Sequence, residues 1–288
     1  MTHLGIFGAG RIGGEVAFLA SINGLCDRLV LHDSYKPLLK SQILDLEHTG
    51  VDCEITTELN EIKNCDVCVF AAGSPRDPSV KTRADLLAAN IKVAHEFSSH
   101  INSFSGILIS ITNPMDVNNY MLWKMTKIPK ERCIGFGGQL DSARFMSNLK
   151  KRGIPGNSIV MGEHGEFQVP VFSTLKGEVN EPLRDEILKE LRKASMEVIT
   201  GKGGTVFGPA YHIYQLIETI CKDKRTIVPC SAILDGEYGE SNCSLGVPAK
   251  IGKEGILSIE EWKLDSWEEK HFREAAEFVR DLCSGVNI

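Results

Sequence analysis

The segment GEHGEF, residues 162–167, places His164 where it could exchange a proton, bind a metal or simply occupy a loop. Histidine is the side chain whose ordinary pKa lets it gain or lose a proton near neutral pH. Glu163 and Glu166 flank it, but no further histidine or cysteine lies at the spacing of a metal site. We therefore expect no metal here, and the role of His164 depends on what the fold brings beside it.

The segment LDSAR supplies a carboxylate and a guanidinium at helical spacing. Asp141 and Arg144 are three residues apart, so they would share one face of a helix. Exposed pairs of this kind usually contribute less than about 1 kcal/mol to stability. This pair lies in an apolar segment at the junction of the two halves of the chain. There, Arg144 could bind a substrate carboxylate through two parallel hydrogen bonds.

The segment GAGRIG, residues 8–13, follows a strand-like run and precedes a helix-like one. Its first glycine permits a tight turn, its second lets the backbone approach a pyrophosphate, and its third lets helix and strand pack closely. Asp33 ends the next strand, where a carboxylate would bind the ribose hydroxyls of a dinucleotide. It would repel the extra phosphate of NADP, so NAD is favoured, and Lys36 leaves NADP use open.

The segment ITNP places Asn113 at the end of another strand. A buried amide there could contact both the cofactor and a substrate oxygen. Taken alone, Asn-Pro is also an ordinary turn signal.

In this order along the chain, GAGRIG, AGSPRDP, TRADLL, ITNP, LDSAR and GEHGE resemble the lactate and malate dehydrogenases, the NAD-dependent 2-hydroxyacid enzymes. The resemblance runs from Leu4 to the last helix. The segments KGGTVFGPA and GVPAKIGKEGI are most similar to the archaeal type of malate dehydrogenase. The resemblance implies that His164 exchanges the substrate proton during hydride transfer, with Asp141 as its carboxylate partner. It also implies that Arg144 binds the substrate's C1 carboxylate.

The same resemblance assigns further residues. Those implied at the cofactor are Gly8, Gly10, Arg11, Ile12, Gly13, Asp33, Ala72, Gly73, Asn90, Thr112 and Asn113, and those implied at the substrate are Arg76, Arg83, Asn113, Arg144 and Thr205. Arg83 would lie on a loop that closes over the site and would polarise the reacting carbonyl. Thr205 could contact the substrate, although capping the helix that follows would explain it equally well.

The residue implied to meet the substrate side chain is Arg76. An arginine there would pair with the second carboxylate of a dicarboxylate, whereas lactate dehydrogenases typically offer an amide. Left buried and unpaired, it would cost about 3 kcal/mol. The sequence therefore favours reversible oxidation of (S)-malate to oxaloacetate over lactate or another 2-hydroxyacid. Six residues separate Arg76 from Arg83, one more than the family pattern, which puts this preference in doubt but not the reaction class.

The two halves of the chain must position these residues. The first half, residues 1–138, alternates short apolar strands with amphipathic helices, which predicts a doubly wound parallel sheet of the Rossmann type. The second half, residues 139–288, predicts an α+β substrate domain. Its last helix opens with Ser266 three residues before Glu269, the spacing of a capping box.

The composition excludes several classes of protein. The net charge of -6 and the lack of a lysine and arginine block argue against nucleic acid, and the apolar runs fall short of the ~20 residues that span a membrane. The chain begins without signal-peptide features, and its nine scattered cysteines suit reduced thiols in the cytoplasm. Cys65 and Cys68 should point to opposite faces of a strand.

Two alternatives concern assembly and activity. The helix through Leu87, Ile91 and Ala94, with the segment DLEHTG, resembles family segments that form subunit contacts, which implies a homodimer or homotetramer. A non-catalytic NAD-binding sensor would have lost Asp141, Arg144 or His164. All three residues are present, which favours an active dehydrogenase.

Overall fold

The computed structural model describes residues 1–73 and 83–285, and for residues 83–88 the backbone alone. The first part of the chain contains β1 (His3–Phe7), α1 (Arg11–Ile22), β2 (Arg28–His32), α2 (Lys36–His48), β3 (Glu54–Thr56), β4 (Val67–Phe70), α3 (Arg83–His100), β5 (Ile107–Ser110), α4 (Met115–Thr126) and β6 (Cys133–Gly135), with short 3-10 helices at Leu59–Asn64 and Lys130–Arg132.

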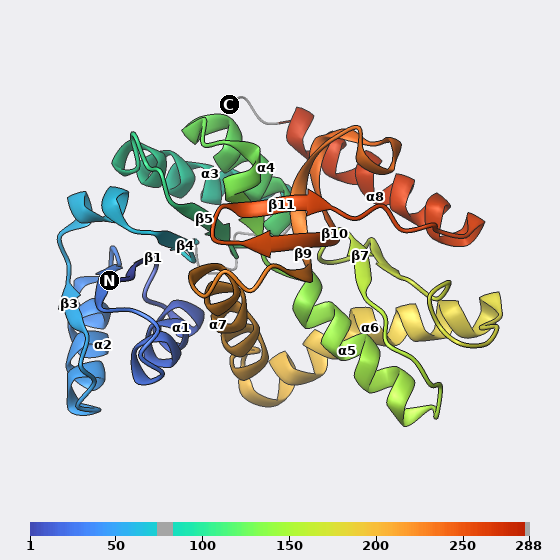
Figure 1. Ribbon diagram of the computed structural model, residues 1–288, viewed down its shortest axis with the longest axis horizontal. Helices are drawn as coiled ribbons and strands as arrows, with labels where there is room; N and C mark the ends of the chain where they lie inside the picture. The colour runs from blue at the N-terminus through green and yellow to red at the C-terminus, as the bar shows by residue number, and fades with distance from the viewer. Residues whose placement is uncertain (74–82, 286–288) are drawn as a thin grey trace.

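The second part begins with a helix and is mixed in character (Figure 1). It contains α5 (Gly138–Lys151), β7 (Val160–Gly162), β8 (Gln168–Pro170), α6 (Glu181–Lys202), α7 (Phe207–Cys221), β9 (Thr226–Asp235), β10 (Ser241–Gly252), β11 (Gly255–Ile259) and α8 (Ser266–Ser284), with a 3-10 turn at Glu237–Gly239.

One sheet runs through both parts. Strands β3, β2, β1, β4, β5 and β6 are parallel neighbours in that order, and β9, β10, β7 and β8 continue the sheet with antiparallel pairing. The two parts join where β6 pairs with β9 through Gly135 and Ser231. The predicted fold class, a doubly wound parallel sheet followed by an α+β part, is confirmed.

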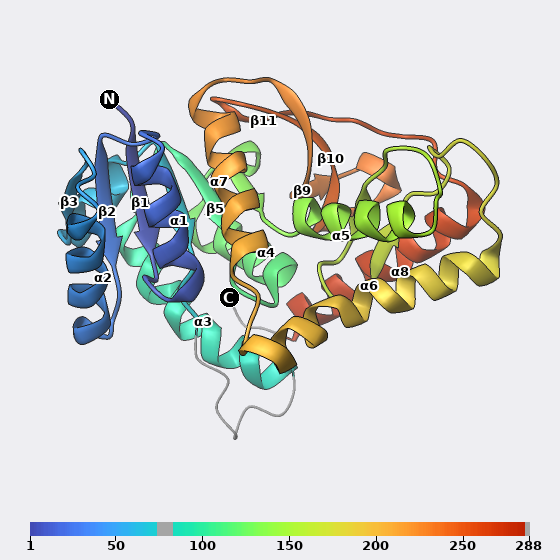
Figure 2. The ribbon, with the colours of Figure 1, turned by 90° about the horizontal axis from the view of Figure 1, so that it is seen from below.

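Alternating residues of the parallel strands build two separate cores. Leu4 and Ile6 of β1 belong to a core that includes side chains of α1, α2 and α7, whereas Phe7 belongs to a core that includes side chains of α3 and α4. Successive side chains of a strand point to opposite faces, so a strand buried on both sides reads as a continuous apolar run. Figure 2 shows α1 and α2 on one side of β1 and β2. The sheet is therefore covered on both faces.

A third core joins the helices of the second part. Phe145 of α5, Phe172 after β8 and Trp267 of α8 pack edge to face. Arg184 of α6 lies over both Phe172 and Trp267 and forms an ion pair with Asp265 at 2.6 Å.

The capping box of α8 begins one residue earlier than its predicted position. Asp265, not Ser266, is the N-cap, and its side chain accepts from the N–H groups of Trp267 and Glu268. Glu268, not Glu269, closes the box by accepting from the Asp265 N–H at 2.9 Å. Glu268 also accepts from two backbone N–H groups after β8. The local sequence around Ser266 gives no sign of these distant contacts.

The prediction for Cys65 and Cys68 was wrong. Cys65 lies before β4, at the end of a 3-10 helix, so the alternation of a strand does not reach it. Both side chains join the same core, and a Cβ placed on Gly5 would lie 3.2 Å from one sulfur and 3.5 Å from the other. All nine cysteines are free thiols.

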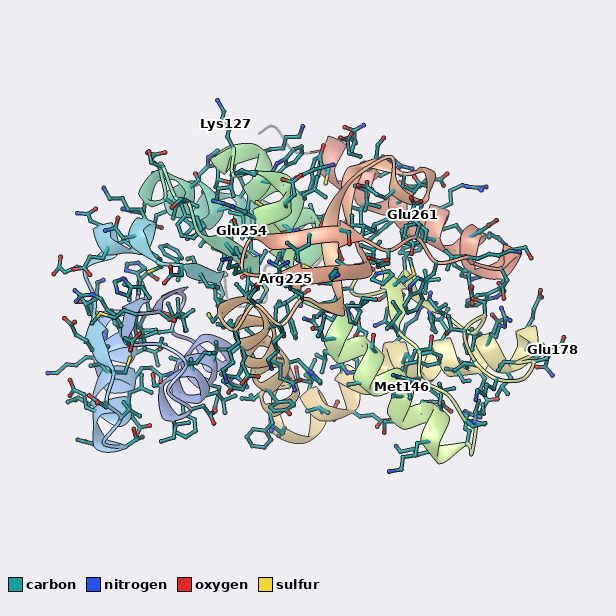
Figure 3. The ribbon with its side chains drawn as sticks, in the orientation of Figure 1. Lys127, Met146, Glu178, Arg225, Glu254 and Glu261 are labelled. Carbon is teal, nitrogen blue, oxygen red and sulfur yellow. The ribbon has the colours of Figure 1, made fainter. Side chains whose placement is uncertain are left out.

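Charged side chains cover much of the surface, among them Lys127, Arg225, Glu254 and Glu261 (Figure 3). No helix of the described residues is long and apolar enough to cross a membrane. Ala94, expected near a subunit contact, is 1% exposed and lies in the protein's own core. This residue therefore cannot form part of a contact surface.

Candidate active site

The structure brings Asp141, Arg144 and His164 together. One carboxylate oxygen of Asp141 lies 2.6 Å from His164 Nδ1, and the other accepts from Arg144 Nη1 at 3.1 Å. The Asp141 side chain is 3% exposed, whereas those of His164 and Arg144 are 18% and 19% exposed. A buried anion thus orients two partly accessible groups that can reach a ligand.

Two local structures hold this arrangement. Asp141 and Arg144 lie near the start of α5, where the helix dipole favours a negative charge. His164 lies in the turn between β7 and β8, whose register pairs Gly162 with Gln168. Gly137 precedes α5, and a Cβ there would come within 2.5 Å of the imidazole. The turn and the helix can therefore approach closely only because residue 137 is a glycine.

Electrostatics favour a protonated His164. Burial lowers the pKa of this imidazole, but the charge and hydrogen bond of Asp141, with the charges of Asp116 and Glu163, raise it to about 9. Burial raises the pKa of Asp141, and the charge and hydrogen bond of His164 and the charge of Arg144 bring it below its usual value. The site therefore stores a proton on His164, and Asp141 stays ionised.

Asp116, which the sequence analysis missed, holds the backbone of this histidine. Its carboxylate accepts from the His164 N–H at 2.7 Å and from the Ser231 hydroxyl at 2.6 Å. Burial and repulsion by Glu163 raise the pKa of Asp116 to about 7. The sequence offered one indication of this role: Asp116 is an acidic residue three positions after Asn113, which was itself expected at the site.

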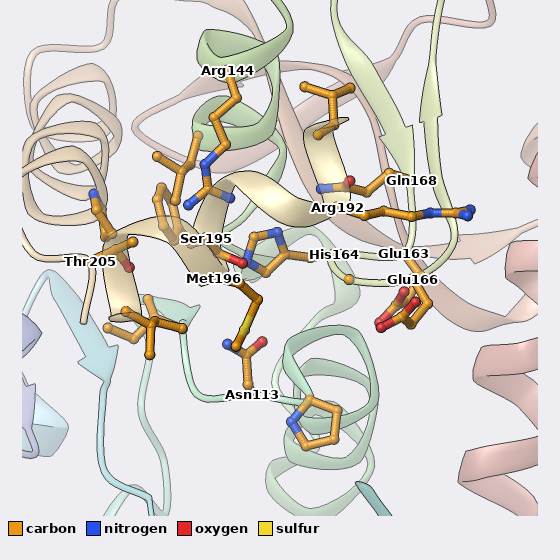
Figure 4. A pocket seen from close by; sticks show the side chains of 18 of the residues that line it. Asn113, Arg144, Glu163, His164, Glu166, Gln168, Arg192, Ser195, Met196 and Thr205 are labelled. Carbon is orange, nitrogen blue, oxygen red and sulfur yellow. The ribbon is translucent and has the colours of Figure 1, made fainter. Parts of the chain in front are cut away.

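A cavity of about 350 Å³ opens in front of these groups (Figure 4). Arg144, His164, Asn113 and Thr205 all line it, so four of the residues predicted for catalysis or substrate binding meet there. Val206, not Thr205, is the N-cap of α7, and no side chain caps that helix. The alternative explanation of Thr205 as a helix cap is therefore wrong.

The cavity also contains residues that the sequence did not indicate. Gln168 is 3% exposed and hydrogen-bonds to Asp141. Ser195 and Met196 of α6 line the same cavity beside His164, as Figure 4 shows. Arg192, one turn earlier, lies at its edge with its guanidinium directed away from His164. These side chains come from a hairpin and a long helix whose placement depends on tertiary packing.

A second cavity, of about 280 Å³, lies against the glycine-rich loop. Its lining includes the predicted cofactor residues Gly10, Arg11, Ile12, Gly13, Gly73, Asn90, Thr112 and Asn113. Ile12, Ile111 and Asn113 line both cavities, so the two adjoin. A ligand in the second cavity would therefore reach the edge of the first.

The glycines of this loop fit a phosphate cradle. A Cβ on Gly13 would lie 1.9 Å from the Gly8 carbonyl oxygen, and one on Gly8, whose φ is +110°, would lie 2.4 Å from the Ala72 nitrogen. Near Gly10, in contrast, a Cβ would meet nothing within 4 Å. Two glycines are thus required by packing, and the middle one faces open space that a pyrophosphate can occupy.

Asp33 lies at the end of β2 beside this loop. Its two carboxylate oxygens accept from the N–H groups of Ala9 and Tyr35, each at 2.9 Å. These bonds fix the carboxylate and leave lone pairs for ribose hydroxyls. Arg11, expected at the cofactor, lines the second cavity and also donates to the Gly203 carbonyl at 2.7 Å, which links the loop to the end of α6.

The remaining cofactor candidates form one hydrogen-bonded group. Asn90 donates to the Asn113 carbonyl at 2.8 Å, and the Thr112 hydroxyl donates to the Ala72 carbonyl at 2.7 Å. A Cβ on Gly73 would lie 2.8 Å from the Thr112 methyl. The ends of β4 and β5 are therefore tied together at the cofactor side.

Two predicted residues cannot be placed here. Arg76 lies outside the described residues. Arg83 begins α3, and its side chain lies outside them too. Among the residues that the structure describes, no group of three or more histidine, cysteine or acidic side chains could hold a metal.

Comparison with known proteins gives the family. Residues 2–135 match the lactate/malate dehydrogenase NAD binding domain, and residues 139–283 match the lactate/malate dehydrogenase alpha/beta C-terminal domain. The chain is 35% identical to a malate dehydrogenase of Haloferax volcanii, with 98% of each chain covered. It is 32% identical to an L-lactate dehydrogenase of a Geobacillus strain, with 99% of this chain and 96% of the relative covered.

A solved structure agrees with this result. The malate dehydrogenase from Archaeoglobus fulgidus in complex with NADH superposes with a TM-score of 0.89 at 32% identity, and 99% of each chain is covered. The chain belongs to the lactate/malate dehydrogenase family, whose N-terminal domain binds NAD. The predicted family, enzyme class and cofactor are thereby confirmed.

Proposed function

We propose that this protein is a malate dehydrogenase that reversibly oxidises (S)-malate to oxaloacetate with NAD. The observation that carries the proposal is the bonding of Asp141 to both His164 and Arg144, beside a cavity that adjoins the glycine-rich loop. The Asp141 carboxylate thus fixes both His164, which can exchange a proton, and Arg144, which can bind a carboxylate. This is the arrangement that oxidation of a 2-hydroxyacid requires.

Each residue would have a distinct task in the reaction. Arg144 would bind the C1 carboxylate. In the oxidation direction the neutral form of His164, which predominates only above about pH 9, would accept the hydroxyl proton through Nε2 because Asp141 occupies Nδ1. Asp141 would hold the ring orientation and stabilise the imidazolium. Bound NAD would supply the acceptor for the hydride leaving C2. NAD would be held by the glycine-rich cradle, with Gly8, Gly10 and Gly13, and by the carboxylate of Asp33. In the reverse reaction, Arg83 would polarise the substrate carbonyl.

Selection of malate over lactate would rest on Arg76. A dicarboxylate needs a second cation besides Arg144, and Arg76 is the residue that matches the family position facing the substrate side chain. Relatives named malate dehydrogenase support this choice, at 35% and 34% identity over nearly the whole chain. Arg192 is the competing cation, because it lines the cavity, although its guanidinium is directed away from His164.

The test is steady-state NADH oxidation with oxaloacetate and with pyruvate, in the wild type, Arg76→Gln and the matched control Arg192→Gln. We expect the wild type to prefer oxaloacetate by about two orders of magnitude in kcat/KM. Arg76→Gln should lose this margin, and Arg192→Gln should keep it. Comparable use of pyruvate by the wild type would refute the malate assignment. Loss of the margin in Arg192→Gln alone would refute the role of Arg76. If neither oxoacid were turned over, the result would favour the alternative of a non-catalytic NAD-binding sensor.

Two further properties follow the family. We propose a homodimer or homotetramer, for which exposed Leu44 of α2, just before the DLEHTG segment, offers an apolar contact. Sedimentation velocity would give the mass directly, and a monomer at assay concentration would contradict the proposal. We also propose a cytoplasmic enzyme, since its nine cysteines are free thiols. Localisation of the tagged protein by fluorescence tests this point.

A further inference from the structure

Two cysteines lie close together at the end of the sheet opposite the active site. Cys26 precedes β2 and Cys53 precedes β3, whereas the glycine-rich loop and Asp33 follow the carboxyl ends of strands. The two sulfur atoms are 3.7 Å apart, although 27 positions separate the residues in the sequence. This contact has no part in the proposed reaction.

The backbone around the pair is set by the sheet. Strands β2 and β3 are parallel neighbours with Arg28 opposite Glu54, and the Glu54 N–H donates to the Asp27 carbonyl at 3.0 Å. Continuing this register places Cys53 opposite Asp27, the residue next to Cys26, and the two sulfurs already lie 3.7 Å apart, against about 2 Å in a disulfide. A bond between the sulfurs therefore requires rotation of two side chains and leaves the strands in register.

The two thiols differ in environment. Cys26 is 4% exposed, whereas Cys53 is partly exposed and can meet a solute. The hydrogen bond from Cys26 lowers the pKa of Cys53 to about 7, although burial opposes this shift. The same hydrogen bond, with burial, raises the pKa of Cys26. Cys53 is thus the thiolate that can attack, and Cys26 is a protonated neighbour held beside it.

We propose that Cys26 and Cys53 form a reversible dithiol–disulfide site that exchanges with small-molecule disulfides. The Cys53 thiolate attacks one sulfur of the reagent, whose S–S bond breaks and releases one thiolate. Cys26 then gives its proton to water and attacks the Cys53 sulfur, which releases the second thiolate. The two cysteines are oxidised to one disulfide, and the reagent disulfide is reduced to two thiols.

Cys65 and Cys68 provide an internal control. Their sulfurs lie on the same side of the sheet, but the residues are only 3% and 0% exposed. Burial raises the pKa of Cys65 to about 12 and that of Cys68 well above its usual value. A reagent in water therefore reaches Cys53 and does not reach this second pair, although C-x-x-C is the spacing that sequence alone would associate with redox chemistry.

The test is incubation of the reduced, full-length protein with an excess of oxidised glutathione, followed by thiol counting and peptide mapping by mass spectrometry. We expect the wild type to lose two of its nine thiols and to give one cross-linked peptide containing Cys26 and Cys53, reversed by dithiothreitol. Cys53→Ser should keep its remaining thiols. Cys26→Ala should retain glutathione on Cys53, because the thiol that would displace it is absent.

Three results would overturn the proposal. They are retention of all nine thiols by the wild type, a stable glutathione adduct on Cys53 in the wild type, and a disulfide between any other cysteines. Each of these results is obtained with the wild type alone. Each is therefore decisive even if one of the variants folds poorly.

Discussion

Replacing Asp141 with asparagine should separate its two proposed roles, which are to orient the His164 ring and to stabilise the imidazolium by its charge. Asparagine keeps the size of the side chain and can still accept from Arg144, but it removes the negative charge 2.6 Å from His164 Nδ1. In the proposed reaction, reduction of the oxoacid requires the imidazolium, because His164 would then donate the proton. The variant should therefore lose activity in this direction as its histidine becomes neutral at lower pH.

The size of the effect follows from the shift of the imidazole pKa. The site raises the pKa of His164 from 6.5 to about 9, and Asp141 supplies the largest of the contributions that raise it. A return to about 6.5 corresponds to roughly 3 kcal/mol. At pH 8 the protonated fraction would fall from about 90% to about 3%, which is a loss of about thirtyfold.

The assay is kcat/KM for reduction of the preferred 2-oxoacid, measured from NADH absorbance between pH 6 and 10. The wild type should stay active up to a midpoint near pH 9, and Asp141→Asn should show its midpoint at least one unit lower. Asp116→Asn is the matched control, because Asp116 is ionised only above about pH 7 and bonds to the backbone N–H of His164, not to its ring. Its midpoint should move less. Equal midpoints in Asp141→Asn and the wild type would refute the electrostatic explanation.

The same shift predicts a change in stability. The pKa of His164 is higher in the folded protein than in the unfolded chain, so protonation stabilises the fold fully below about pH 6.5. That contribution is lost as the pH rises through about 9. Urea unfolding at pH 6 and at pH 10 should show this difference in the wild type. A variant lacking the Asp141 charge should show less of it.

Three further changes test the cofactor site and the cores. Asp33→Asn should raise kcat/KM with NADPH relative to NADH by about tenfold, because the charge that repels the extra phosphate is lost; an unchanged ratio in coupled assays would argue against this role. Phe97→Ala should lower the free energy of unfolding by about 3–5 kcal/mol in urea titrations, since the ring is fully buried against Phe7 and Phe70. Glu268→Gln should lower it by about 2 kcal/mol, because both carboxylate oxygens accept from donors and an amide nitrogen cannot; a neutral effect on the urea midpoint would contradict that reasoning.

Sequence patterns predicted the parts of the molecule that local rules control. Apolar runs such as VCVF indicated buried parallel strands, and the spacing of Asp141 and Arg144 correctly indicated one helix face. Gly8 and Gly13 were assigned from the turn geometry that they occupy. In each case the cause lies within a few residues of the pattern.

Features decided by distant contacts could not be predicted in the same way. Asp265 caps α8 in place of Ser266 because Glu268 also bonds to the backbone after β8, about 95 residues away. Gln168 meets Asp141 only once the β7–β8 hairpin packs on α5. The proximity of Cys26 to Cys53 depends on strand pairing. None of these partners is a neighbour in sequence.

The pairing of β6 with β9 has a mechanical consequence. Ser231, which faces Gly135 in that pairing, also donates to Asp116, and Asp116 accepts from the backbone of His164. A hinge motion that swung the two halves apart would have to break the sheet and release the histidine turn together. The geometry of the proposed catalytic site therefore resists rotation of one half relative to the other.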